Sequence, residues 1–164
     1  MPMQNDPTNL DIQLPAPPSP AGDYLPVMIR EGLGFVSGQV PLRNGRLLYT
    51  GRVGAELTPE QGKAAAEVAA LNVLAQIDRA LTSWEQFAGL LQVQGFVASA
   101  QGFINQPEIL DGASRLFVDV LGDLGRHTRS AFSVEQLPLN SPVELVVTFA
   151  AKQDREQPSR GSPG

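Results

Sequence analysis

The chain has 164 residues, of which 42% are hydrophobic and 18% are charged, and its formal net charge is -5. This length and composition are typical of one globular domain rather than of a disordered or membrane-embedded chain. Lysine and arginine form no cluster, which disfavours a nucleic-acid partner because phosphate contacts need concentrated positive charge. Cysteine is absent and His127 is the single histidine, so disulfides, thiolate chemistry and metal sites built from several such side chains are excluded.

Both ends of the chain differ in composition from its middle. Residues 1–20 are polar and proline-rich, and the run from Leu14 to Pro20 favours an extended polyproline conformation. Residues 152–164 combine charged residues with Pro, Ser and Gly, which is typical of disorder. No segment is typical of a signal peptide or approaches the roughly 20 apolar residues of a membrane span. We therefore expect a cytoplasmic protein without membrane contact, with one domain over residues 21–151 between two tails.

The first half of the predicted domain begins with short strands. Residues 27–30 and 34–40 predict two strands, with Glu31–Gly32 as the turn between them. The Asn44–Gly45 pair predicts a hairpin, because both residues tolerate positive φ. Residues 46–49 would form its returning strand.

Two helices and three further strands are predicted after the hairpin. A long helix from Thr58 to about Leu81 is indicated by a capping residue, an early proline and a broad apolar face. Alternation over residues 91–97 predicts a strand, and apolar residues spaced by three and four predict a second helix over 107–124. Residues 130–136 and 143–151 predict two last strands. Because a short turn joins these two strands, we expect them to be antiparallel neighbours.

This order of elements predicts an α+β fold in two layers, with two helices on one mixed sheet of five to six strands. The helices can cover only one face of that sheet. On the other face the last strand carries Glu144, Val146, Thr148 and Ala150, which is still largely apolar. An apolar face without a covering helix predicts packing against another copy of the chain.

Two charged residues in the last two strands are candidates for chemistry. Arg129 stands at the entrance to its strand, where an arginine is usually solvated. Glu144 interrupts an apolar strand, where a carboxylate either faces water or needs a partner. In the expected hairpin they lie towards opposite ends, so they need not touch within one chain. The spacing of Ser37 and His127 in the sequence does not support a serine–histidine pair. The position of His127 is typical of a cation at the end of a helix.

Several segments of the chain form an ordered set: Tyr24, Phe35–Pro41, Leu71–Leu74, Thr128–Phe132, Leu137–Pro138 and Val143–Leu145. Together they resemble the Rid family, also called the YjgF family. The resemblance covers residues 21–151 and implies a chorismate-mutase-like fold, a homotrimer and clefts between its subunits.

The resemblance also implies a reaction and the residues that perform it. Archetypal members hydrolyse reactive enamines and imines, such as 2-aminoacrylate, to a 2-keto acid and ammonia without a metal or an organic cofactor. Arg129 matches the arginine that would bind the substrate carboxylate, and Glu144 matches the glutamate that would orient water or shuttle a proton. Tyr24, Ser37 and Gly38 would shape the wall of the cleft.

The sequence departs from the family pattern in the second helix and after it. Ser114 and Phe117 replace an asparagine and a tyrosine at predicted substrate contacts, and His127–Thr128 replaces Pro-Ala before Arg129. The leading prediction is an imine deaminase acting on small 2-imino acids. The alternative is a non-catalytic trimer that binds a small carboxylate metabolite. A ribonuclease comes third, because the net charge is -5.

Overall fold

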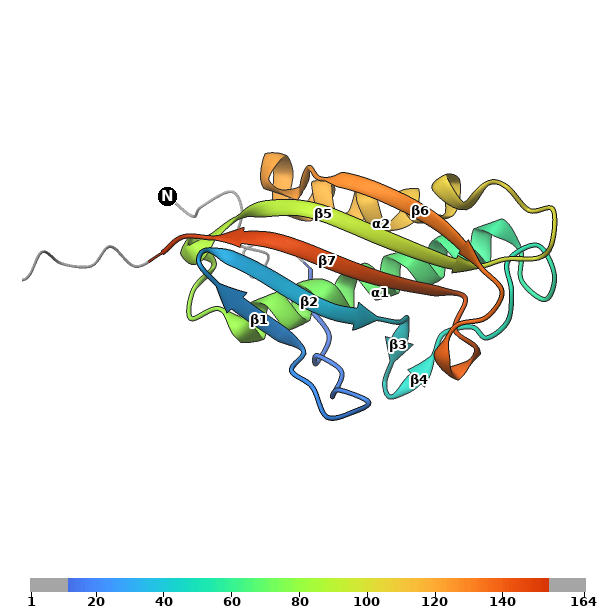
Figure 1. Cartoon of the computed structure of the whole chain (residues 1–164), viewed down its shortest axis with the longest axis horizontal. Helices are drawn as coiled ribbons and strands as arrows, with labels where there is room; N and C mark the ends of the chain where they lie inside the picture. The colour runs from blue at the N-terminus through green and yellow to red at the C-terminus, as the bar shows by residue number, and fades with distance from the viewer. Residues whose placement is uncertain (1–11, 154–164) are drawn as a thin grey trace, which may run out of the picture.

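The computed structural model describes residues 12–153 (Figure 1). Residues 1–11 of the predicted extension and residues 154–164 of the predicted tail lie outside the described residues. The helices and strands, in chain order, are β1 (Val27–Arg30), β2 (Leu33–Gln39), β3 (Leu42–Arg43), β4 (Arg46–Leu47), α1 (Pro59–Ala80), β5 (Phe87–Ala98), α2 (Gln106–Leu121), β6 (Thr128–Val134) and β7 (Val143–Ala151).

Five strands form one mixed sheet, and both helices lie behind it in Figure 1. The strand order is β1-β2-β7-β5-β6, in which β5 and β6 are parallel and the other neighbours are antiparallel. The separate pair β3-β4 forms a small hairpin. The predicted α+β class and the two-layer arrangement of two helices on a mixed sheet are confirmed.

The prediction that the last two strands pair with each other is wrong. Strand β5 lies between them, pairing Val93 with Arg129 of β6 on one side and with Val147 of β7 on the other. It is 12 residues long and begins at Phe87, four residues before the predicted start. Val93 and Val97 of β5 are 0% exposed, as expected for an interior strand that has a neighbour on each side and contacts α2.

Local sequence signals account for the turns and for the start of α1. Glu31 and Gly32 have φ values of 50° and 75°, and Asn44 and Gly45 have values of 53° and 77°. These positive values are the ones that the two turns require. The Thr58 side chain caps α1 in a capping box with Gln61. Helix α2 ends at Leu121, earlier than predicted, and a 3₁₀ turn over Gly122–Gly125 follows it.

The core lies between the helices and one face of the sheet. Helix α1 presents small side chains to the sheet, which lets its backbone approach the strands closely. A salt bridge joins the two helices to each other, with Lys63 Nζ of α1 2.9 Å from Glu108 Oε1 of α2. Fully buried side chains on both sides of this layer include Ala65, Ala66, Ala69, Ala70, Val73, Val93, Leu145, Val147 and Phe149.

The opposite face of the sheet, nearest the viewer in Figure 1, has no helix over it within residues 12–153. Leu33, Phe35 and Phe132 are 42%, 48% and 43% exposed, and the Phe132 ring stacks on Phe96 with centroids 5.2 Å apart. We call this side the open face. Its apolar character is as predicted, and packing against another copy stays a prediction. None of the helices in the described part of the chain is long and apolar enough to cross a membrane.

The described part of the proline-rich extension lies against the domain. Ile12 and Leu14 pack against the core. Gln76 of α1 donates a hydrogen bond from Nε2 to the carbonyl oxygen of Pro18 at 2.7 Å. Residues 12–20 form no strand or helix, in keeping with their composition.

Candidate functional site

The sequence-predicted site residues fall into two groups on opposite faces of the sheet. In the sheet, Arg129 lies opposite Val93, whose side chain faces the helices, whereas Glu144 lies opposite Phe96, whose side chain is on the open face. We call the first group the arginine cluster, which consists of Asp111, Ser114, His127 and Arg129. The second group is the glutamate cluster, which consists of Tyr24, Ser37, Gly38 and Glu144.

The Arg129 guanidinium lies along one stripe of α2. Its Nη1 donates to Asp111 Oδ1 at 2.9 Å and to Ser114 Oγ at 3.0 Å, and its Nη2 donates to the Pro107 carbonyl at 3.2 Å. The three partners are separated by four and three residues, which places them on one face of a helix. Within residues 12–153 the Nε–H has no partner. The side of the guanidinium formed by Nε and Nη2 is therefore left to receive a carboxylate.

His127 links the end of α2 to the arginine cluster. Its Nδ1 lies 2.6 Å from the Gly125 carbonyl oxygen, and its Nε2 lies 2.9 Å from Ser114 Oγ. Burial lowers the pKa of the imidazole below 6.5; the Gly125 hydrogen bond opposes this shift, and the charge of Arg129 adds to it. The ring is therefore neutral at neutral pH.

Phe117 does not reach the surface of the arginine cluster. Its side chain is 0% exposed, because this position of α2 faces the core. The Phe117 ring meets the His127 ring edge-on, with centroids 5.8 Å apart. In this structure the ring supports the imidazole, and the predicted substrate contact at Phe117 stays a prediction.

Next to the arginine cluster lies a shallow, open hollow. Its lining contains two guanidinium groups, an imidazole, a hydroxyl and one aliphatic side chain, contributed by Arg126, Arg129, His127, Ser114 and Val118. An anionic ligand matches this lining by charge.

The glutamate cluster is organised by an irregularity in β2. The register between β2 and β7 shifts between Val36 and Gln39, and the Glu144 side chain lies over Gly38. A Cβ at position 38 would collide with Glu144 Oε1, so a larger residue there would force the carboxylate to turn away from this position. Ser37 Oγ is occupied, since it donates to the Leu25 carbonyl at 2.7 Å.

Glu144 has an unusual environment for a carboxylate. It is half-buried, and within residues 12–153 it has no hydrogen bond or ion pair. Burial raises the pKa of the Glu144 carboxyl above its ordinary value of 4.5. A carboxyl group in this state exchanges a proton closer to neutral pH than a solvated one does.

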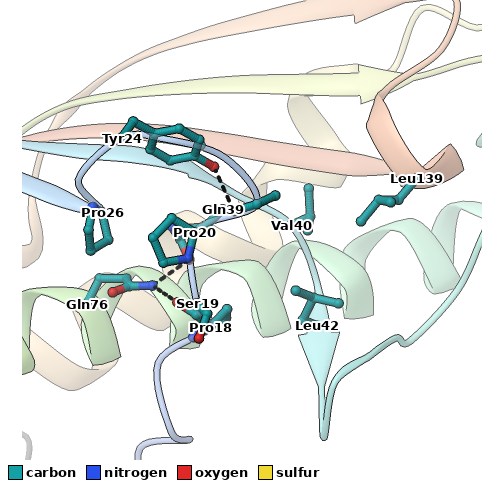
Figure 2. A pocket seen from close by; sticks show the side chains of 12 residues that line it. Pro18, Ser19, Pro20, Tyr24, Pro26, Gln39, Val40, Leu42, Gln76 and Leu139 are labelled. Atoms are coloured by element: carbon teal, nitrogen blue, oxygen red, sulfur yellow. Dashed lines mark hydrogen bonds between the residues drawn. The ribbon is translucent and has the colours of Figure 1, made fainter.

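Tyr24 lies at the edge of a cavity of about 70 Å³, which Figure 2 shows. Gly38 and Gln39 line the same cavity together with residues 18–21, so the N-terminal segment meets the glutamate cluster here. The Tyr24 ring is 49% exposed, and its hydroxyl accepts a hydrogen bond from the Ala21 backbone N–H at 3.3 Å. The structure thus brings Tyr24 to the same corner of the molecule as Gly38.

The two clusters do not meet within one chain. Strand β5 separates β6 from β7, and two strand spacings amount to roughly 10 Å. The side chains of Arg129 and Glu144 then point to opposite faces. One small molecule cannot contact both clusters of a single subunit.

Two contributions to the arginine cluster were missed from the sequence. Asp111 shares a helical face with Pro107 and Ser114, and this spacing was a usable signal. The pairing of His127 with Ser114 had no such signal, because 13 residues and the end of a helix separate them. Within residues 12–153, no group of three acidic or histidine side chains is arranged to hold a metal ion.

Comparisons with known proteins agree over most of the chain. A family model described as YjgF/chorismate mutase-like, putative endoribonuclease, matches residues 8–152, so the match begins within the predicted N-terminal extension. Protein TCP17 of Trypanosoma cruzi is 37% identical over 137 residues, which are 83% of this chain and 86% of that protein.

Two crystal structures extend this likeness to the fold. A protein of unknown function from Agrobacterium tumefaciens is 35% identical, with a TM-score of 0.82 over 89% of this chain and 90% of that one. A putative endoribonuclease from Shewanella oneidensis is 32% identical, with a TM-score of 0.84 over 89% of this chain and 99% of that one. Sequence and fold therefore agree along nearly the full length of these proteins.

Proposed function

Because the chain belongs to the Rid (YjgF/chorismate-mutase-like) family, we propose that it hydrolyses small 2-imino acids to 2-keto acids and ammonia at clefts between the subunits of a homotrimer. The observation that carries this proposal is the complementarity of the two clusters. The arginine cluster keeps one side of a guanidinium for a carboxylate, and the glutamate cluster holds an unpaired carboxyl with a raised pKa.

In the proposed reaction, Arg129 holds the substrate carboxylate through its Nε–H and an Nη2–H. Glu144 of a neighbouring subunit takes a proton from a water molecule as the water oxygen attacks the imine carbon. The nitrogen gains a proton, and the resulting carbinolamine loses ammonia to leave the 2-keto acid. One imino acid and one water thus give one keto acid and one ammonia.

The placement of the clusters supports the proposed assembly. Strand β6 is an edge strand, and Glu144 lies on the open face, whose exposed apolar side chains favour contact with another copy. Arg129 and Glu144 lie apart within one chain, but a cleft between subunits would bring Arg129 of one subunit close to Glu144 of the next. A monomer in a solution size measurement would contradict this assembly.

The test generates 2-aminoacrylate with an auxiliary enzyme and follows its loss with the wild-type protein, with Arg129→Ala and with buffer alone. We expect the wild type to accelerate the loss and Arg129→Ala to accelerate it much less, because the substrate carboxylate binds more weakly. The matched control is Arg115→Ala, since Arg115 is exposed on the same helix and we expect its removal to leave the rate unchanged. A wild type no faster than buffer would overturn the deaminase proposal.

A non-catalytic binding protein is the second candidate, and specific observations in α2 favour it. Ser114 is engaged by His127 and Arg129, and Phe117 is buried, so the amide and phenol expected from the family pattern have no counterpart here. If the wild type does not accelerate imine loss but pyruvate binds and raises the melting temperature, this candidate stands. We do not propose ribonuclease activity, because the net charge of -5 and the absence of a basic cluster disfavour RNA binding.

A further inference from the structure

The pairing of Ser114 with His127 has a defined direction. The Gly125 carbonyl oxygen can only accept a hydrogen bond, so the His127 Nδ1, 2.6 Å away, carries the proton. The neutral ring then offers the Nε2 lone pair to the Ser114 hydroxyl, whose oxygen lies 2.9 Å from it. A hydroxyl, a base within hydrogen-bond reach and a third group that orients the base are the parts of an activated serine.

The surroundings suit this role. Burial keeps the imidazole unprotonated at neutral pH, as a base requires. Arg129 Nη1 donates to Ser114 Oγ at 3.0 Å, and a positive donor there favours negative charge on that oxygen as it loses its proton.

The pair is also accessible from solvent. Ser114 and His127 line the open hollow together with Arg126, Arg129 and Val118, which is 39% exposed. Arg126 pairs through Nε with Asp123 at 3.2 Å and Arg129 through Nη1 with Asp111 at 2.9 Å, so their remaining N–H groups offer a place for a ligand carboxylate and for the negative charge that develops on an attacked carbonyl oxygen. Val118 offers an apolar surface for the short carbon chain between these groups.

We infer that Ser114 and His127 form a nucleophile–base pair that hydrolyses activated esters or thioesters bearing a second, free carboxylate. Ser114 Oγ attacks the carbonyl carbon while His127 Nε2 takes its proton. The alcohol or thiol leaves with that proton, and an acyl group remains on Ser114. A water molecule deprotonated by His127 then releases the acid and restores the serine. This chemistry goes beyond imine hydrolysis and does not require Glu144.

The competing explanation is that the pair only ties α2 to β6. The test compares the hydrolysis of mono-4-nitrophenyl succinate, which carries a free carboxylate, with that of 4-nitrophenyl acetate by the full chain. We expect faster hydrolysis of the succinate ester, and a rate that falls with decreasing pH as His127 becomes protonated below 6.5. Ser114→Ala and His127→Gln should each lower the rate by about 10²-fold or more. The control Ser133→Ala removes an exposed serine on β6 and should change nothing.

A second measurement uses only the wild-type chain. After acid quenching, peptide mass spectra should show the succinyl group on Ser114 rather than on Lys63 or Lys152, and this result decides the inference even if a variant fails to fold. Acylation confined to the lysines, or equal rates in wild type and a folded Ser114→Ala, would overturn it. Imine hydrolysis is assayed separately, so failure of this inference and failure of the deaminase proposal are distinguishable.

Discussion

The arginine cluster and the glutamate cluster differ in whether their charged side chains have hydrogen-bond or ion-pair partners. In the arginine cluster, each charged or ionisable side chain has a partner: Arg129 pairs with Asp111, and His127 bonds to Gly125 and Ser114. In the glutamate cluster, Glu144 is half-buried and has no partner among residues 12–153. The first arrangement positions a charge, and the second keeps a carboxyl ready to exchange a proton.

The two clusters therefore also differ in how much each lowers the stability of the folded protein. A paired arginine at a helix surface costs little, because its charge is compensated. A partly buried carboxyl without a partner lowers stability, so its presence points to a functional use or to a partner from another subunit. Glu144 and Arg129 therefore should respond differently to substitution.

The largest effect is expected for Glu144→Gln. Loss of the proton-transfer group should lower imine hydrolysis by about 10²- to 10⁴-fold. The free energy of unfolding should stay the same or increase, because the amide carries no charge. Rate assays and urea denaturation measure the two quantities. Glu135→Gln, which removes an exposed carboxyl just beyond β6, is the control; equal rate losses in both variants would contradict a specific role for Glu144.

A smaller effect is expected when the guanidinium is removed. Arg129→Ala should raise the Kd for pyruvate by about 10- to 100-fold, since hydrogen bonds to charged groups contribute about 1.5–3 kcal/mol. Arg129→Lys should recover only part of the affinity, because an ammonium lacks the planar pair of donors. Asp111 is 39% exposed and can be solvated, so the variants should fold. Calorimetric titration checks this; an unchanged Kd in Arg129→Ala would remove Arg129 from the binding site.

Gly112→Ala should perturb the arginine cluster through its helix. An added Cβ would stand 2.6 Å from the Lys63 carbonyl oxygen of α1, and a backbone atom in a helix cannot move aside alone. We expect a loss of about 1–3 kcal/mol in the free energy of unfolding, with weaker pyruvate binding because α2 carries Asp111 and Ser114. Denaturation and titration test both effects. Arg115→Ala on the same helix should stay within about 0.5 kcal/mol of wild type.

The smallest effect is an opposite pH dependence in the two clusters. Glu144 has a folded pKa above 4.5, so its contribution to stability falls as pH rises from 4.5 through the raised value. His127 has a folded pKa below 6.5, so its contribution is complete above 6.5 and is lost as pH falls through the lowered value. Relative to wild type, Glu144→Gln should gain stability as pH rises, and His127→Gln should lose less stability in acid. Urea denaturation between pH 4.5 and 8 measures this, and parallel curves for all three proteins would contradict it.

Much of the fold was predictable because its signals are local. Thr58 with Gln61 marked the start of α1, Asn44–Gly45 marked the hairpin, and the spacing of apolar residues marked α2. The strand pairing was not predictable in the same way. The short connection between β6 and β7 suggested a hairpin, but β5 occupies the position between them.

The candidate site was likewise predictable only in part. The resemblance placed Arg129 and Glu144 in the chain, and it placed Gly38 near them, where the structure shows Glu144 lying over that glycine. It did not reveal the contacts of Arg129 with Asp111 or of His127 with Ser114. These contacts join residues from different elements. Periodicity in the sequence does not predict which residues on one face of a helix will contact an edge strand.

The sequence by itself determined the helices, the turns and the α+β class, because capping, positive φ and apolar periodicity act between residues close in the chain. The family followed from the resemblance of an ordered set of motifs. Only the tertiary structure decided which face each charged side chain occupies. That choice follows from strand order and register, and a shift of one residue reverses the face on which a strand residue lies. For this reason Arg129 and Glu144, which the resemblance assigned to one cleft between subunits, lie on opposite sides of the sheet within one chain.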